Sequence, residues 1–132
     1  LNHFMPNEMH HGDCIGSDKQ ANDLFLAYHI ANDIIMRRLV IHPPENNYKR
    51  AYALQSLSKV VKDALSNCTY KIVIEERDSF PYLERNHHIV DVSDVIIATP
   101  KEFEHTLRSG TWATIRYGWK MKKNVIIIPP RN

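Results

Sequence analysis

The stretch from Asp94 to Ile128 constrains the fold most, because two short apolar runs enclose a helical pattern. The runs Val95–Ala98 and Val125–Ile128 read as strands that are buried on both faces of a parallel sheet. Between the runs, apolar side chains recur at helical spacing at Trp112, Ile115 and Trp119. The stretch therefore predicts a strand, a helix over Thr111–Met121 and a second parallel strand.

The rest of the chain continues this alternation of strand and helix. We expect strands at Glu8–His11, Leu39–Ile41 and Tyr70–Ile74. We expect helices from about Asp18 to Ile35, from Leu54 to Ser66 and over Tyr82–Val92. With no repeat and no linker, this order predicts one α/β domain over residues 1–132, doubly wound, with helices on both faces of a mainly parallel sheet.

Composition limits the class of protein. The 132 residues are 43% hydrophobic, which is enough for a core. Seventeen basic and fifteen acidic residues leave a net charge of +2, so nucleic acid is not the expected partner. The sequence shows no membrane-spanning apolar run and no signal peptide, and its two cysteines do not suggest a disulfide framework. We therefore predict a cytoplasmic protein with no membrane partner.

The loop Gly12–Asp18 between the first strand and the first helix has two interpretations. It is either a tight turn that Asp18 caps, or a loop whose amides and Asp13 hold a ribose or a phosphate. A second helix start with small residues, at Ser109-Gly110-Thr111, favours the binding interpretation. Ligands of open α/β sheets lie at the carboxyl ends of the strands, where both loops are expected.

The helix that begins at Tyr82 follows a strand end in the same way. Arg85 and Asn86 belong either to a solvated face or to a ligand site, where the guanidinium would bind a phosphate and the amide a base. Both interpretations stay open. Trp112 and Trp119 are expected in a core or an interface, because the helical spacing already explains them.

Polar residues near His10 also raise the question of a metal ion. His10 and His11 are adjacent on a strand, so their side chains should point to opposite faces and cannot easily share one ion. We predict no metal site. Cys14 is expected to be a small buried residue rather than a nucleophile, because the sequence indicates no partner base.

Four blocks carry a family resemblance: HHGDCIGSD (His10–Asp18), HPP (His42–Pro44), PYLERNHHIVDVSDVIIATP (Pro81–Pro100) and SGTWATIRYGWKMKKNVIII (Ser109–Ile128). The chain resembles small members of the Rossmann-like SLOG superfamily, which includes the LOG "lysine decarboxylase-like" proteins and DprA-type domains. The resemblance implies a Rossmann-like three-layer α/β/α fold that binds a nucleotide-derived small molecule without a separate cofactor. The resemblance is compatible with a homo-oligomer. The predicted ligand-binding residues are Gly12, Asp13, Gly16, Ser17, Asp18, Pro43, Arg85, Asn86, Thr99, Ser109, Gly110 and Thr111.

Catalysis is the second hypothesis. Resembling families that cleave or exchange N-glycosidic bonds place a glutamate three residues after the Gly-Thr pair, whereas this chain has Thr114. A hydroxyl without an activating partner cannot replace that carboxylate, although Glu102 or Glu104 could substitute from the preceding loop. A binding module and an N-glycosidic hydrolase or transferase for nucleoside monophosphates therefore both stand, and no catalytic residue is assigned.

The resemblance also implies a strand, a Gly/Thr-rich loop and a helix before the first block. Without that strand, Glu8–His11 and Val95–Ala98 would flank an open slot with unpaired backbone groups. We therefore expect that a strand and a helix precede Leu1 in the natural protein, or that another segment fills the slot.

Overall fold

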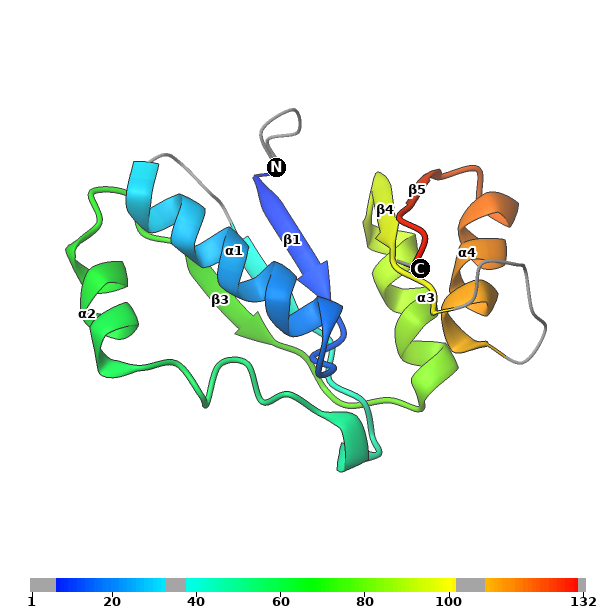
Figure 1. Ribbon diagram of the computed structural model, residues 1–132, viewed down its shortest axis with the longest axis horizontal. Coiled ribbons are helices and arrows are strands. Elements are labelled where there is room, and N and C mark those ends of the chain that lie inside the picture. The colour runs from blue at the N-terminus through cyan, green and yellow to red at the C-terminus, as the bar shows by residue number, and fades with distance from the viewer. Residues whose placement is uncertain (1–6, 33–37, 102–108, 131–132) are drawn as a thin grey trace. The chain divides into compact units, whose positions relative to one another are not determined.

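The computed structural model describes residues 7–32, 38–101 and 109–130. The chain forms two compact units, Leu1–Phe80 and Pro81–Asn132, and each is described by itself. Both are mixed α/β, with short parallel strands in two small sheets that helices flank (Figure 1). The predicted α/β class is thus confirmed at this coarse level.

The first unit contains three strands that pair in the order β1-β2-β3, all parallel. In the register of this sheet, Met9 lies beside Leu39, and Leu39 beside Ile74. The elements of the unit are β1 (Glu8–His11), α1 (Ser17–Asn32), β2 (Arg38–Ile41), a 3-10 turn (Asn47–Lys49), α2 (Lys59–Asn67) and β3 (Val73–Glu76).

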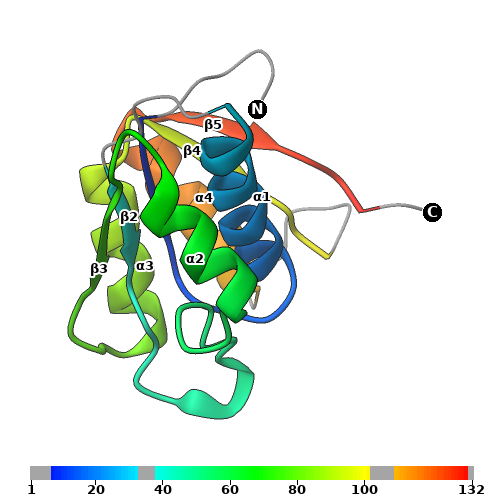
Figure 2. The ribbon, with the colours of Figure 1, turned by 90° about the vertical axis from the view of Figure 1, so that its left-hand side faces the viewer.

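The core of this unit lies between one face of the sheet and the helices α1 and α2 (Figure 2). Phe25 and Leu26 of α1 are buried against Leu39 of β2. Partly buried apolar side chains from the strands, the helices and the segments between them pack against these residues: Met9, Tyr28, Leu57, Leu65, Ile72 and Ile74. Alternation along the strands explains the arrangement, because Met9, Leu39 and Ile74 share a face.

The opposite face of the same sheet is polar. Arg38 of β2 lies between two carboxylates, with its Nη2 3.2 Å from Oε2 of Glu75 and its Nε 3.8 Å from Oε1 of Glu8. Glu75 also pairs with Arg77 at 3.2 Å. Besides these charges, the same face carries two valines, the fully buried Val40 and the half-exposed Val73.

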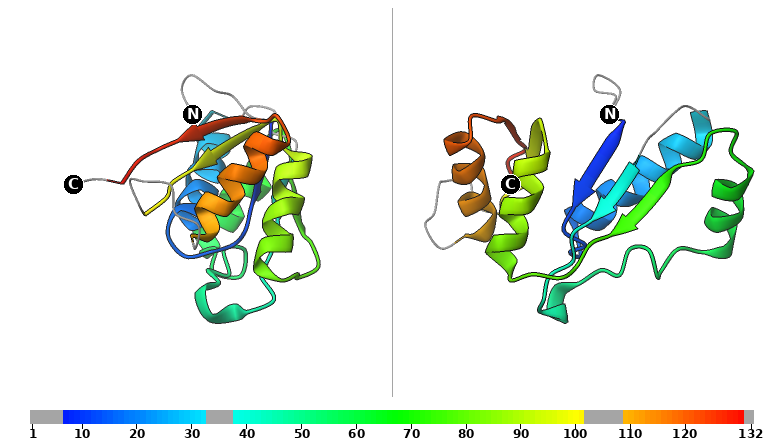
Figure 3. Two further views of the ribbon diagram at one scale, coloured as in Figure 1. Left: turned by 90° about the vertical axis from the view of Figure 1, so that its right-hand side faces the viewer. Right: turned by 180° about the vertical axis from the view of Figure 1, so that it is seen from behind.

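The second unit has two parallel strands, β4 (Val95–Ala98) and β5 (Asn124–Ile127), and two helices, α3 (Tyr82–Val92) and α4 (Gly110–Lys120) (Figure 3). The predicted strand–helix–strand crossover is confirmed. Its core consists of Ala98, Trp112 and Ile115, with Val125 and Ile127 packed against them. Trp112 therefore takes the predicted core position, whereas Trp119 is half exposed.

The starts of two elements differ from the prediction by three residues or more. Helix α2 begins at Lys59 rather than Leu54. The amides of Ser56 and Leu57 donate to the carbonyls of Tyr52 and Leu54 in a separate turn, and the Ser58 hydroxyl caps the later start by accepting from the Val61 amide at 3.2 Å. Strand β3 begins at Val73 rather than Tyr70, where its ladder with β2 starts. Just before it, the Lys71 ammonium donates to the carbonyls of Ser66 and Cys68. Hydrophobic periodicity alone does not detect either cause.

Several predictions stay predictions at this level. They include the single domain, the doubly wound three-layer arrangement and the segment expected before Leu1. Glu102 and Glu104 lie outside the described residues. Among the helices of the described ranges, none combines the length and apolar character required to cross a bilayer.

Candidate functional site

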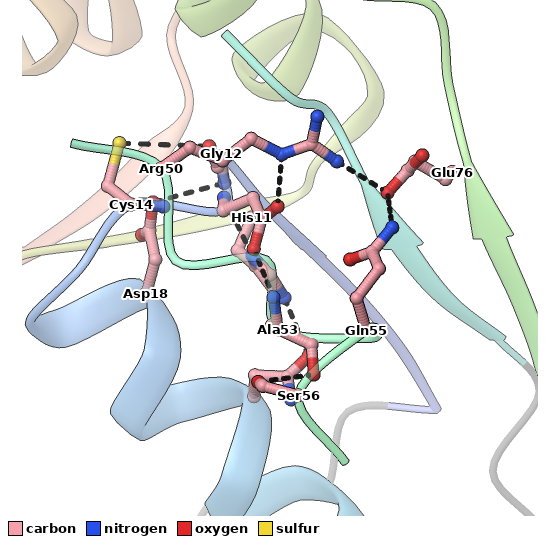
Figure 4. A network of polar contacts seen from close by, with 11 residues as sticks. His11, Gly12, Cys14, Asp18, Arg50, Ala53, Gln55, Ser56 and Glu76 are labelled. Atoms are coloured by element: carbon pink, nitrogen blue, oxygen red, sulfur yellow. Dashed lines mark hydrogen bonds and ion pairs between the residues drawn. The ribbon is translucent and has the colours of Figure 1, made fainter. Parts of the chain in front are cut away.

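The amides of the loop after β1 donate to acceptors within the protein (Figure 4). Oδ2 of Asp18 accepts from the amides of Gly12 and Cys14, each at 3.2 Å. The Asp13 amide donates to Nδ1 of His11 at 3.0 Å, and the Ile15 amide to the Lys49 carbonyl at 3.0 Å. Each of these four amides thus already has an acceptor, and one acceptor is an anionic carboxylate.

Asp13 ties this loop to residues 50–53. Its carboxylate is fully buried and accepts from Nε of Arg50 and from the Ala53 amide, both at 2.8 Å. Its carbonyl accepts from the Ala51 amide at 2.7 Å. Arg50 continues the network to Oε1 of Glu76 at 2.7 Å (Figure 4). Asp13 adopts a φ of 55°, in the left-handed region that aspartate tolerates better than most residues.

His10 and His11 have different partners on opposite faces of β1, as predicted. Nε2 of His11 donates to Oδ1 of Asn22 at 2.8 Å, which leaves Nδ1 as the acceptor for the Asp13 amide. His10 instead contacts Oε1 of Glu8 at 2.7 Å and Nε2 of His42 at 2.8 Å. In the ranges that the structure describes, no group of three His, Cys, Asp or Glu side chains is arranged to hold a metal ion.

The other predicted residues of the first unit have simpler surroundings. Gly16 has a φ of 95°, and a Cβ built on it would meet nothing within 4 Å. Glycine is therefore favoured at position 16 by the backbone conformation rather than by a close neighbour. Ser17 is exposed at the start of α1, and Pro43 is buried just after β2.

In the second unit, the structure brings the start of α3 against the start of α4. A Cβ built on Gly110 would lie 2.8 Å from Cε1 of Tyr82, so the tyrosine ring occupies the space that the glycine leaves. Cζ of Arg85 lies 4.7 Å from the centroid of the same ring, and Nε of Arg85 donates to Oδ1 of Asn86 at 2.8 Å. Arg85 is only 2% exposed. Arg85, Asn86 and Gly110 therefore meet around Tyr82.

The first turn of α4 is capped by its own side chains. The Ser109 hydroxyl accepts from the Trp112 amide at 3.2 Å, as an N-cap does. Thr111 is half buried in this turn, and the Thr114 hydroxyl donates to the Gly110 carbonyl at 3.0 Å. Thr99 is exposed just after β4.

The predicted ligand set thus falls into two groups, one in each unit. Sequence reasoning missed Arg50 and Glu76, the partners that hold the Asp13 network together. Arg50 lies 37 positions from Asp13, and no local pattern links the two residues. It also missed the contact between Gly110 and Tyr82, the residue at which a helix was expected to begin.

A surface pair joins the two helices of the second unit. The Tyr117 hydroxyl donates to Oδ1 of Asp91 at 2.6 Å, and the Tyr117 ring stacks on His87 with centroids 3.7 Å apart. The pKa of Tyr117 is raised above 10.0, mainly because this hydrogen bond favours the neutral phenol, with further contributions from burial and the Asp91 charge.

No protein-family model, no curated protein and no solved structure matches this chain. The resemblance carried by the four sequence blocks therefore stays a prediction, and any function has to be inferred from the geometry.

Proposed function

We propose that this chain binds a nucleotide or a nucleotide-derived ligand, and that the starts of α3 and α4 receive its phosphate. The proposal includes a doubly wound, Rossmann-like domain of the SLOG type. One observation carries it: Arg85, Asn86 and Gly110 meet around Tyr82 where two helices begin.

Electrostatics supports an anionic ligand at this place. A helix N-terminus contributes roughly 0.3–1 kcal/mol toward a nearby negative charge, and here two helices begin side by side. A charge-assisted hydrogen bond from a guanidinium adds roughly 1.5–3 kcal/mol. The side chain of Arg85 is held by the Tyr82 ring and by Asn86. Less rotamer freedom is therefore lost when it binds a phosphate.

The surroundings also suit the rest of a nucleotide. Tyr82 is 48% exposed, so its ring can contact a base or a sugar while its other parts pack on Gly110 and Arg85. The loop after β1 is a weaker candidate for the phosphate, because the Asp18 carboxylate already accepts from two of its amides. We therefore assign the phosphate to the second unit.

Binding without catalysis is the simpler function for this geometry. The Thr114 hydroxyl, at the position where resembling families have a glutamate, donates to the backbone of its own helix. That hydrogen bond gives it no activating base. The N-glycosidic hydrolase or transferase remains the alternative hypothesis.

The substitution Arg85→Ala tests the proposal. Nucleoside monophosphates and the matching nucleosides would be titrated into the protein by calorimetry. Loss of the charge-assisted hydrogen bond should weaken binding of the phosphorylated ligands at least tenfold more than that of the nucleosides. Arg85→Lys keeps the positive charge but lacks the paired N–H donors of the guanidinium. It should weaken phosphate binding less than Arg85→Ala does.

Lys120→Ala serves as the matched control, because it removes an exposed cation from the far end of α4. Far-UV circular dichroism checks that each variant folds. Equal losses for phosphates and nucleosides would assign Arg85 to structure and contradict the proposal. Chromatography of the same mixtures for free base tests the hydrolase hypothesis directly.

A further inference from the structure

Two histidines of the first unit are joined ring to ring on the polar face of the sheet. Nδ1 of His10 lies 2.8 Å from Nε2 of His42, and the ring centroids are 5.1 Å apart. On its other side, Nε2 of His10 lies 2.7 Å from Oε1 of Glu8. The side chain of His10 and the whole of His42 are each only 6% exposed. Water therefore has little access to the two rings, so the protons that they carry must suit these partners.

The number of protons decides whether the two rings stay joined. A ring nitrogen donates when it carries a proton and accepts when it does not, so the contact between the two nitrogens holds one proton. With both rings neutral, Nε2–H of His10 donates to the Glu8 carboxylate, and Nδ1 of His10 accepts from Nε2–H of His42. Each of the two contacts then has one donor and one acceptor.

The same contacts accommodate one added proton. That proton goes to Nδ1 of His10, which then donates to Nε2 of His42, while the N–H of His42 moves to its Nδ1. The hydrogen bond reverses but persists, and the new imidazolium lies against the carboxylate of Glu8. A second added proton does not fit. It would place N–H donors on both facing nitrogens and bring two cationic rings within 5.1 Å of each other.

The charges around the pair compensate one added proton and not two. In the described part of the first unit, the charged side chains on this face of the three strands are Glu8, Arg38, Glu75 and Arg77. Their charges cancel while both rings are neutral. Glu8 contacts the His10 ring directly, and Nε of Arg38 lies 3.8 Å from the same Oε1. A second proton would therefore add a positive charge to a face that already carries a net charge of +1.

The pair also supports the segment that follows β2. The His42 amide donates to the His11 carbonyl at 2.8 Å, which attaches the start of this segment to β1. The amide of the exposed Glu45 donates to the Phe80 carbonyl at 2.9 Å, and Pro44 forms a parallel bridge with Phe80. Phe80 is the last residue of the first unit. The side-chain contact of His42 thus belongs to a set of contacts that extends to the end of this unit.

We propose that the His10–His42 pair is an acid-sensitive latch, which keeps one added proton and opens when a second proton binds. Opening separates the His42 ring from β1 and loosens the contacts of residues 42–45 with Phe80. Phe25, Leu26 and Leu39 form the core on the opposite face of the sheet, under α1 and α2. The pair is not part of that core, so its opening leaves the packing of the core in place.

Nuclear magnetic resonance of the full 132-residue chain tests the latch, with the labelled histidine rings followed as the pH is lowered. The ring signals of His10 and His42 should move together in two steps, because sites that interact this closely do not titrate independently. The affinities for the two protons should differ by roughly tenfold or more. The amide signals of His42, Glu45 and Phe80 should change only in the second step.

Substitutions assign the two steps. His42→Gln should leave a single step for His10, because glutamine cannot take the second proton. Glu8→Gln keeps an acceptor oxygen but removes the charge, and should lower the affinity for the first proton roughly threefold or more. His87→Gln, which replaces an exposed histidine of α3, is the matched control and should leave both steps unchanged. The titration of the unsubstituted chain remains decisive where a variant fails to fold.

Three results would overturn the proposal. The first is an independent single step for each ring, which would show that the rings do not share a proton. The second is a change of the amide signals of His42, Glu45 and Phe80 with the first proton, or no change in these signals at all. The third is the loss of signals across the whole sheet in the second step, because that result would mean general unfolding rather than the opening of a latch.

Discussion

Two glycine-containing helix starts, Gly12–Ser17 in the first unit and Ser109–Thr111 in the second, look alike in sequence but are built differently. In the first, the amides of Gly12 and Cys14 converge on the carboxylate of Asp18. In the second, the Ser109 hydroxyl accepts one amide, and α3 brings the cation of Arg85 to the Tyr82 ring, while its first turn also carries the exposed Glu84. The first helix start therefore already contains an anion, whereas the second has a cation near two helix N-termini.

The glycines of these two helix starts show why the sequences mislead. Gly16 lies in open space and is required by its φ of 95°. At Gly110 the constraint comes from the Tyr82 ring, whose Cε1 lies 2.8 Å from the position that a Cβ would take, so a larger residue would require the ring to move. One glycine serves the backbone and the other serves a contact from a different helix. A glycine at a helix start therefore does not by itself indicate a phosphate loop.

The largest loss of stability should come from replacing Asp13, the fully buried carboxylate in the loop of the first helix start. Asp13→Ala removes the acceptor for Arg50 and Ala53 and leaves the mostly buried guanidinium without this partner. We expect the free energy of unfolding, measured with urea, to fall by about 3 kcal/mol. Asp13→Asn keeps an acceptor and tolerates the positive φ, so it should lose less. Equal losses for both variants would contradict this expectation and would show that the carboxylate charge, rather than an acceptor oxygen, accounts for the stabilisation.

The capping groups of the two helix starts should differ in strength. Asp18→Ala removes an acceptor of two amides and should lower the free energy of unfolding by about 2 kcal/mol. Ser109→Ala removes an acceptor of one amide and should lower it by about 1 kcal/mol. Both are measured by chemical denaturation under the same conditions. A greater loss of unfolding free energy for Ser109→Ala than for Asp18→Ala would contradict this expectation.

A double-mutant cycle tests the contact that explains Gly110. Gly110→Ala places a methyl group against Tyr82 and should be destabilising in the native background. In a Tyr82→Ala background the same change meets no ring, so its cost should be smaller by about 1 kcal/mol. Additive effects would mean that Gly110 is required for another reason, such as approach of a ligand.

The smallest effect concerns a carboxylate on the surface of the second unit, in contrast to the buried Asp13. Because folding raises the pKa of Tyr117, its contribution to stability is full below the unfolded tyrosine pKa of about 10 and is lost as pH rises through the folded pKa. Asp91→Asn removes the charge and should lower the pKa of Tyr117 toward 10.0. Ultraviolet absorbance of the phenolate measures this change. An unchanged titration would show that the charge of Asp91 does not raise the pKa of Tyr117 in solution.

The sequence by itself determined the elements whose signals are local. The bounds of β1, α3 and β4 agree with the prediction, because an apolar run or Pro81 at a helix start acts within a few residues. The parallel crossover from β4 to β5 followed from the same local patterns. The opposite directions of His10 and His11 followed from the two-residue period of a strand.

Only the tertiary structure decided which candidate residues meet. Asp13 and Arg50 are 37 positions apart, and Tyr82 and Gly110 come from different helices, so neither contact leaves a periodic trace in the sequence. Periodicity reports burial on one element, whereas a contact between elements depends on how the chain packs, and that is set by all the elements of a unit together.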